Sequence, residues 1–564
     1  MKKYILSAIA VAGMFAMTSC EDFLKPTSEG AYTSENYFQN DQQAIDAVDA
    51  CYMRFLEENC FGRQIMWEQA AANDFVWGRT RSWPELATLS LTGSVGPLND
   101  VWGELTKTQQ RANWLVSSLL DKQKSTELTA IEKRSLGEAY FIRALAHFYI
   151  AYRYGTGEQG VPFVRFEDFD GGYDYSIPTQ QPTVMDNYKM IVDDLSKAEA
   201  LLPTCEEYSD ADFGRAHKAA CAGYKAKVYA YWACWDKSQY ANVITEVNKM
   251  MTQYGRDLAD NFTDNFTSDW NKWRNKEYVW AIPGEGAGKG QYGGIEFPGV
   301  ILDNGAWGYM NGWGQFKPSL DIYEQMDQDS QNLKADVNAD GIVDIEDNIR
   351  LRNSILEYNQ PFKFFGDDMR FYSIRDVESG FMIAKYLEPF THDDPIANGY
   401  VGDNGDWPVC RINFPILRFA DCLLLRAEAK LATGDAAGAT QDINKVRNRS
   451  NVKDLDHTAT WADLYHERRV ELAFEHSDHL YDLKRWAVGG NAEIKALAIA
   501  ELEAHPKVRH YVDRADPTST FTPGPYLDYQ EPAKKWEDYK MVFPYRDTEI
   551  ARANGALKQN KNYE

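Results

Sequence analysis

Apolar residues recur at helical spacing along most of this 564-residue chain, and the helices that this spacing predicts come in neighbouring pairs. In one pair, a helix over 413–432 is followed by Gly434-Asp435 and a second helix over 435–449. Small residues such as Ala427 and Ala429 recur on the first helix, where close helix packing requires them. The remaining expected helices are 41–59, 98–122, 129–154, 183–202, 215–235, 239–254 and 459–474.

A small-residue helix, a tight turn and a second amphipathic helix are typical of tetratricopeptide-type units of about 34 residues. Unrelated antiparallel helices would show the same local packing, so the pattern alone leaves that alternative open. We expect a mainly α fold in which tetratricopeptide-like helix pairs form a scaffold carrying long irregular loops and a few short strands.

Five long segments have little helical signal and are rich in Gly, Pro, Trp, Tyr and Asp. Loops of this length are uncommon in compact proteins and usually carry function. Short strands are expected within them at 278–282 and 371–386. The segments are 60–97, 155–182, 257–317, 358–412 and 505–546.

The N-terminus has the features of a bacterial lipoprotein signal. Two lysines precede an apolar run over 4–17, and small residues lead to Cys20, which Glu21 and Asp22 follow. The run is too short to span a bilayer, which takes about 20 apolar residues. Residues 1–19 are therefore predicted to be removed, with Cys20 lipidated and the protein held on the outer face of a membrane. The alternative is an ordinary export signal with an unmodified Cys20.

A formal charge of -24 excludes two classes of partner. Sequence-independent nucleic-acid binding and adhesion to anionic lipid headgroups both require an excess of Lys and Arg. The seven cysteines after Cys20 form no CxxC pair, so neither a disulfide framework nor a cysteine zinc site is expected. A single disulfide, for example between Cys51 and Cys60, is left open.

The segment 336–347 matches the EF-hand calcium loop, with oxygen donors at alternate positions and glycine at the sixth. Gly341 is expected to supply the sharp turn, and Val343 to pack inward. Because there is one copy, we expect a structural Ca²⁺ rather than a sensor; a chance acidic loop is the alternative. The expected ligands are Asp336, Asn338, Asp340, the Ile342 carbonyl, Asp344 and Asp347.

Two other motifs do not fit the chemistry that they suggest. The glycine-rich segment 284–290 lacks the first glycine and the Ser or Thr of a phosphate-binding loop. His476 and His479 lie near acids but outside any zinc-protease motif, and we expect them at a solvated helix end. The chain also has no recognisable hydrolase motif.

Four segments in order resemble the SusD/RagB family of outer-membrane nutrient-binding lipoproteins. They are the lipoprotein start at 19–24, the helix 137–149 with Tyr154-Gly155 and Gly160-Val161-Pro162, the run from Pro415 to Trp486, and the C-terminal Phe543-Pro544, Glu549-Ile550, Gln559-Asn560 and Tyr563. The run includes 424–429, 443–449, 467–475 and 482–486. Two positions depart from the family pattern: His479 where arginine is frequent, and Asn562 where glycine is usual.

The resemblance implies one domain over 20–564, with an N-terminal half to about 255, a loop-rich ligand region over 257–412 and a helical part over 413–564. It also implies a non-catalytic cell-surface receptor that captures oligosaccharides and delivers them to a TonB-dependent, SusC-like outer-membrane transporter. A peptide receptor on the same scaffold and a surface glycoside hydrolase are the alternatives.

Two loops offer the side chains that sugars require. Pyranose C–H faces lie on aromatic rings, while hydroxyls bond planar polar groups. The first loop, 73–83, would supply Trp77 and Trp83 as platforms and Asn73, Asp74, Arg79 and Arg81 for hydroxyls. The second would supply Tyr292, Trp307, Tyr309 and Trp313. The alternative role of these aromatics is to cap the helical core.

Overall fold

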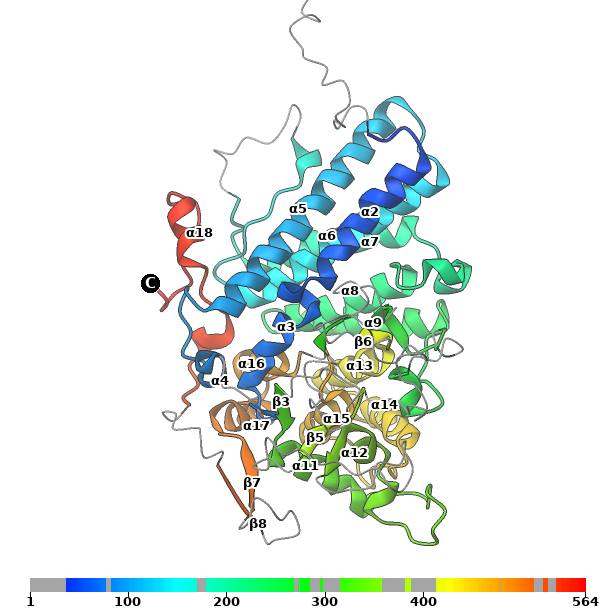
Figure 1. Ribbon diagram of the computed structural model, residues 1–564, viewed down its shortest axis with the longest axis vertical. Helices are drawn as coiled ribbons and strands as arrows, with labels where there is room; N and C mark the ends of the chain where they lie inside the picture. Colours follow the sequence, from blue (N-terminus) through cyan, green and yellow to red (C-terminus); the bar gives the residue numbers. More distant parts are fainter. Residues whose placement is uncertain are drawn as a thin grey trace, which may run out of the picture.

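Helix α6 (Ala130–Tyr154) runs through the middle of the computed structural model and is buried on all sides from Ser135 onward. The Thr129 hydroxyl and the Glu132 carboxylate form a reciprocal capping box that starts the helix. Two long helices, α5 (Gly96–Ser125) and α7 (Val184–Leu201), pack against α6 (Figure 1). This antiparallel layer forms one half of the molecule.

The structure describes the chain in twelve stretches, and every structural statement below concerns these residues. They are 37–77, 83–169, 179–267, 272, 274–284, 295–297, 315–357, 381–386, 412–476, 478–511, 521–525 and 534–564.

Successive helices continue the packing of α6 and α7 into a single stack. Each helix contacts the next, and α9 contacts α13 directly although residues 253–418 separate them in sequence. Gly434, with φ of 89°, ends α13, and the Asp435 side chain caps α14 through the Gly438 N–H at 2.9 Å. The mainly helical, tetratricopeptide-like fold is thereby confirmed. The stack comprises α8 (Lys218–Trp232), α9 (Tyr240–Thr252), α13 (Phe419–Thr433), α14 (Ala436–Arg449) and α15 (Trp461–Leu472).

Between α9 and α13 the chain leaves the helix stack, and an antiparallel strand pair joins the two ends of this long segment. The predicted strand 278–282 is confirmed as β2 (Tyr278–Ile282), and its partner β6 (Phe414–Arg418) begins where a helix was expected. Helix α13 therefore starts at Phe419 and not at 413. Of the expected strand 371–386, β5 (Phe381–Ile383) is described, and it pairs with β4 (Ile355–Glu357).

Two C-terminal helices, α16 (His479–Gly489) and α17 (Ala492–Glu503), were absent from the predicted set. They pack on each other below the N-terminal layer (Figure 1). The other elements are α2 (Asp41–Leu56), α3 (Gln64–Trp67), α4 (Pro84–Thr88), α11 (Leu320–Asp327), α12 (Ile349–Ser354), α18 (Asp547–Arg552), β1 (Phe75–Trp77), β3 (Phe316–Pro318), β7 (Lys507–Tyr511) and β8 (Phe521–Pro525).

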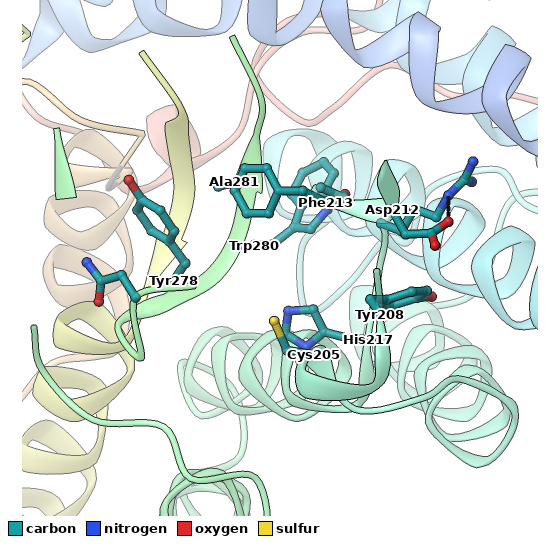
Figure 2. A pocket seen from close by; sticks show the side chains of 11 residues that line it. Cys205, Tyr208, Asp212, Phe213, His217, Tyr278, Trp280 and Ala281 are labelled. Atoms are coloured by element: carbon teal, nitrogen blue, oxygen red, sulfur yellow. Dashed lines mark hydrogen bonds and ion pairs between the residues drawn. The ribbon is translucent and has the colours of Figure 1, made fainter. Parts of the chain in front are cut away.

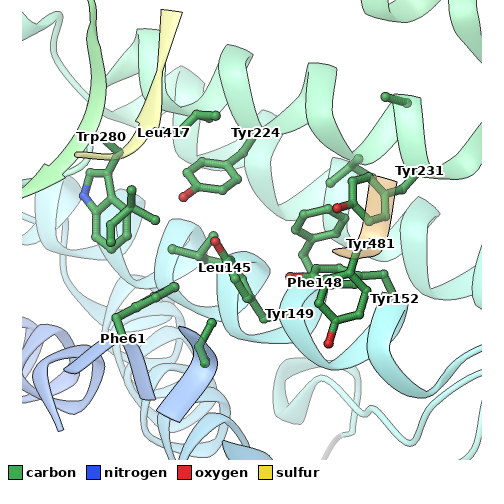
Figure 3. Close-up of a cluster of buried hydrophobic side chains, with 14 of the residues drawn as sticks. Phe61, Leu145, Phe148, Tyr149, Tyr152, Tyr224, Tyr231, Trp280, Leu417 and Tyr481 are labelled. Atoms are coloured by element: carbon green, nitrogen blue, oxygen red, sulfur yellow. The ribbon is translucent and has the colours of Figure 1, made fainter. Parts of the chain in front are cut away.

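Aromatic rings fill the core between the helical layers (Figure 3). The Tyr149 ring on α6 meets Phe61 edge-on at 4.9 Å, and Tyr152 meets Tyr481 of α16 at 4.7 Å. Cys51 and Cys60 are buried free thiols in this structure and do not form the disulfide left open above; burial raises the pKa of each to about 12. None of the described helices is both long and apolar enough to cross a bilayer.

The second half of the molecule has a core of ion pairs. Arg418, at the end of β6, is 1% exposed. Its Nε lies 2.6 Å from the Glu475 carboxylate and its Nη1 lies 3.1 Å from that of Glu471. It also pairs with Glu277, which Arg449 reaches at 2.7 Å. These contacts join β6, the segment before β2, α14 and α15.

Arg418→Met is expected to lower the free energy of unfolding by about 3–5 kcal/mol, because the acids around it would stay buried without their main cation. Urea denaturation would measure the loss. The matched control is Arg552→Met, whose side chain is 75% exposed beside Glu549 and whose loss should change stability by less than about 0.5 kcal/mol. Equal effects of the two substitutions would contradict the role of the buried network.

Candidate functional site

Residues at the edges of the two predicted sugar-binding loops pair in one short ribbon. Strands β1 and β3 pair antiparallel, with Trp77 opposite Phe316 and Phe75 opposite Pro318. The chain that continues after Trp77 and the chain that arrives at Phe316 therefore leave the ribbon at the same end. The first lies in the segment 73–83 and the second follows the segment 292–313, so Trp77 and Phe316, more than two hundred positions apart, are brought together.

Phe75 anchors this ribbon to the core. Its ring contacts Phe316 at 5.5 Å and Phe474, just beyond α15, at 5.4 Å. Ser319, directly after β3, donates its N–H to the Asp74 carbonyl at 3.0 Å, and its hydroxyl bonds the Asn73 carbonyl. The end of the ribbon opposite the two loops is thus fixed by backbone and side-chain bonds.

Asn73 and Asp74 do not lie where a ligand could reach them, which corrects their assignment as sugar contacts. Their exposed fractions are 2% and 3%. The Asn73 amide donates to the Glu501 carbonyl at 3.1 Å, and Asp74 accepts from Arg469 Nε at 2.8 Å. Both side chains hold the start of β1 against α15 and α17, so their role is to position the loop.

Trp83 is partly exposed and firmly placed. Its side chain is among the few large apolar ones at the surface, with 37% exposed, and its backbone is left-handed, with φ of 57°. The indole covers Gly96 at the start of α5, where a Cβ would lie 2.7 Å from the ring. Any side chain at position 96 would displace the ring, so Gly96 makes room for it.

The other predicted contacts cannot be placed by side chain. For Trp77, the structure describes the backbone. Arg79, Arg81, Tyr292, Trp307, Tyr309 and Trp313 lie outside the described residues, as does the predicted lipidation site Cys20.

A buried charge cluster supports the ribbon from behind. His479 Nε2 lies 2.9 Å from a Glu501 oxygen and 3.8 Å from an Asp74 oxygen. Burial lowers the pKa of His479, but Glu501 and Asp74 outweigh it and the net shift is upward. The three side chains have metal-ligand chemistry and lie within 4.8 Å. However, Arg469 already lies 2.8 Å from Asp74 and 3.5 Å from Glu501, so a cation is present.

His476 and His479 are therefore not at a solvated helix end, as the sequence suggested. They are 2% and 8% exposed. His476 packs edge-on against Phe61 and Phe414 at 5.2 and 5.3 Å, and burial lowers its pKa to about 3. It is a neutral core residue at physiological pH.

Glu296 is a buried acid in a short stretch between the two halves of the second loop. It is fully buried, and its carboxylate lies 2.7 Å from Arg63 Nη1. Burial raises its pKa to about 7, and Arg63 offsets that rise only partly. Because the group is enclosed, the raised pKa is a property of the core and not of an accessible acid catalyst.

The segment 336–347 adopts a tight loop stabilised by its own acids. Asp336 accepts N–H groups of Ala339 and Gly341 at 2.6 and 2.7 Å. Gly341 has φ of 89°, the conformation for which glycine was expected at the sixth position. Asp347 is buried and accepts the N–H of Val337 at 2.7 Å and of Asp344 at 3.0 Å.

Asn451, which follows α14, forms hydrogen bonds with both ends of this loop. Its amide donates to the Ala335 carbonyl at 2.9 Å and to the Asp347 carbonyl at 3.1 Å. Val343 is 51% exposed, so the expectation that it packs inward is wrong; the buried Asp347 holds the loop instead. No three of the loop's acids have oxygens within 4.8 Å of one another in this conformation.

A small cavity lies between β2 and the segment 205–217 (Figure 2). The rings of Phe213, Trp280, Tyr208 and His217 face it, and its volume is about 20 Å³. That volume holds one water molecule at most, so the cavity is too small for a sugar ring.

The fold is a helical-repeat scaffold with long connections between some of its helices. Residues 276–563 match the family model described as "SusD family", and residues 22–230 match the one described as "Starch-binding associating with outer membrane". Because the first match spans half of the chain, this protein belongs to the SusD family.

Individual relatives agree with this assignment. A curated SusD-like protein of Bacteroides ovatus is 24% identical over 508 residues, covering 86% of this chain and 83% of the relative. The crystal structure of a SusD-like protein from Bacteroides fragilis has a TM-score of 0.71 at 22% identity, covering 95% of this chain and 100% of that one. A crystal structure with xylogluco-oligosaccharide has a TM-score of 0.68 at 22% identity, covering 90% and 96%.

Proposed function

We propose that this protein is a cell-surface receptor that captures an oligosaccharide and delivers it to a partner TonB-dependent, SusC-like transporter in the outer membrane without breaking a bond. The observation that carries the proposal is the β1–β3 pairing, which places residues at the edges of two aromatic-rich segments side by side. The similar structure with xylogluco-oligosaccharide and the starch-binding family description support a glycan as the ligand.

Recognition would combine stacking with hydrogen bonds to planar groups. Trp77 and Trp83 would offer ring faces, and Arg79 and Arg81 would bond hydroxyls. Across the ribbon end, Tyr292, Trp307, Tyr309 and Trp313 would complete the surface. Each sugar hydroxyl exchanges a bond with water for one with protein, so the net gain per contact is small and affinity is expected to be modest.

The acids behind the ribbon favour a receptor over a hydrolase. A glycosidase requires two carboxyl groups flanking the scissile bond, one of them able to give a proton. Asp74 and Glu501 are buried and held by Arg469 and His479 instead. A peptide receptor on this scaffold is the alternative that a binding test must distinguish.

Residues 336–347 would hold one structural Ca²⁺. The donors would be carboxylates of Asp336, Asp340, Asp344 and Asp347, the Asn338 amide oxygen and the Ile342 carbonyl. Since Asn451 bonds both ends of the loop, the ion would join it to the end of α14. Extracellular calcium is millimolar, so a weak site would be filled.

Trp83→Ala and Trp307→Ala are each expected to weaken oligosaccharide binding about tenfold or more, because each removes a stacking face, and to leave the melting temperature within a few degrees of wild type. Calorimetric titration with maltohexaose, laminarihexaose and a xyloglucan heptasaccharide would measure this, with chromatography to detect cleavage. Trp114→Ala is the matched control: that indole is 38% exposed on α5, beside Phe38 and away from the ribbon.

Unchanged affinity in both loop variants would remove the ribbon site from the proposal. Cleaved products would replace the receptor by a hydrolase, and binding of peptides with no glycan bound would change the ligand class.

Chelation of calcium is expected to lower the melting temperature of the wild-type protein, because an ion that binds only the folded state stabilises it. Asp340→Ala should melt at that lower temperature whether calcium is present or absent. Asp121→Ala, at an exposed position on α5, serves as the control and should keep the full response. A wild-type protein indifferent to calcium would exclude the site.

Cys20→Ala is expected to release the protein from the outer membrane, because acyl chains on Cys20 would be its anchor. Fractionation of cells expressing each form would measure the membrane-bound share. Persistence of the variant in the membrane fraction would mean that another anchor holds it.

A further inference from the structure

A cleft lies on the N-terminal layer, and none of its described lining residues belongs to the ribbon. Its volume is about 570 Å³, within the range that ligand sites occupy. One face of α5 forms its floor, and α18 with the turn after it forms a wall. In Figure 1, α18 lies beside α5 on the C-terminal side of the molecule.

The floor of this cleft carries amides and a hydroxyl at helical spacing. Thr106, Gln109, Gln110 and Asn113 line it from α5, with the two adjacent glutamines three or four residues from Thr106 and from Asn113. None of the described residues that line the cleft has a carboxylate, although the chain contains 84 acids. Amides and hydroxyls both donate and accept, which matches the hydroxyls of a neutral sugar.

Gln109 is the side chain that points to a ligand. It is 7% exposed, and its amide nitrogen is enclosed without a hydrogen-bond partner. A buried donor in this state is unfavourable. The last torsion of a glutamine is soft, so the amide could turn its N–H groups toward a hydroxyl in the cleft.

The walls of the cleft are held in place. Asn113 donates to the Val164 carbonyl at 2.9 Å and accepts the Phe166 N–H at 3.2 Å. The same amide oxygen accepts from the buried Arg143 at 2.8 Å. The C-terminal segment is fixed by Asn560, which donates to the Tyr154 carbonyl at 2.9 Å. A rigid cleft loses little entropy when a ligand binds.

The cleft lies along α5, the helix whose first residue Trp83 covers. That indole covers Gly96, the first residue of α5, whereas the cleft residues occupy positions 102 to 113. At 1.5 Å per residue, they begin about 9 Å and end about 26 Å further along the axis. An oligosaccharide of several units leaving the ribbon past Trp83 could follow α5 into the cleft.

We propose that this cleft is a second sugar-binding subsite, which takes a further part of the oligosaccharide bound at the ribbon and hydrogen-bonds it through Gln109. The inference rests on the proposed glycan-binding function. It predicts a longer footprint than the ribbon alone provides, and hence stronger binding of longer chains.

The test compares binding of maltohexaose, laminarihexaose and xyloglucan heptasaccharide to the full protein and to four variants. One of these is Trp83→Ala, described above, and the other three concern the cleft. Gln109→Leu should weaken binding about three- to tenfold while the melting temperature stays equal or rises, because an unpaired buried amide is removed. Ala553→Trp, which fills the cleft from its wall, should weaken binding at least as much. Gln123→Leu, an exposed glutamine on the same helix, is the control and should bind as wild type does.

Hydrogen exchange gives a readout that does not depend on substitution. The oligosaccharide should slow exchange in residues 102–113 of the wild type, and Ala553→Trp should lose that protection. Wild-type affinity in Gln109→Leu and Ala553→Trp, without protection at 102–113, overturns the subsite.

The outcomes separate this inference from the proposed function. If Trp83→Ala weakens binding and both cleft variants do not, the subsite alone fails. If the wild type binds none of the three sugars, both proposals fail. If the cleft variants weaken binding and Trp83→Ala does not, the cleft stands and the ribbon assignment falls.

Discussion

Helix α15 buries a row of charged side chains, and each of them pairs with an opposite charge from another element. These ion pairs hold the lower half of the molecule together. Glu467 pairs with Arg350, Arg468 with Asp482, and Arg469 with Asp74, while Glu471 meets Arg418 and Arg449. These partners come from α12, α16, the start of β1, β6 and α14. Since removal of one partner leaves another charge buried and unpaired, the contacts specify one arrangement of these elements.

The same residues explain what the sequence could and could not predict. The run 467–475 contributes to the resemblance to the SusD family, yet its dense charge suggested a solvated helix end. A local pattern shows that a helix is charged all round but not which distant residues neutralise it. Asn73 and Asp74 were misassigned for the same reason, because their partners Glu501 and Arg469 lie 428 and 395 residues away.

Helices with strong periodicity were predicted well, and their ends agree where caps such as Thr129 and Gly434-Asp435 mark them. Helices α16 and α17 were not, although Asn491 caps α17 and its apolar spacing could have indicated it. The site was anticipated as two separate loops. The residues at the edges of these loops are brought together by the register of β1 and β3, which is long-range strand pairing and has no local signature.

The burial of Glu296 makes the stability of the folded protein depend on pH. Its pKa is about 7 in the folded protein and about 4.5 when the carboxyl is exposed to water, so between these values the folded chain holds a proton that the unfolded chain releases. This contribution to stability is complete below about pH 4.5 and is lost as pH rises through 7. Protonation of Glu296 beside Arg63 therefore makes the folded chain more stable in mild acid than in a neutral medium.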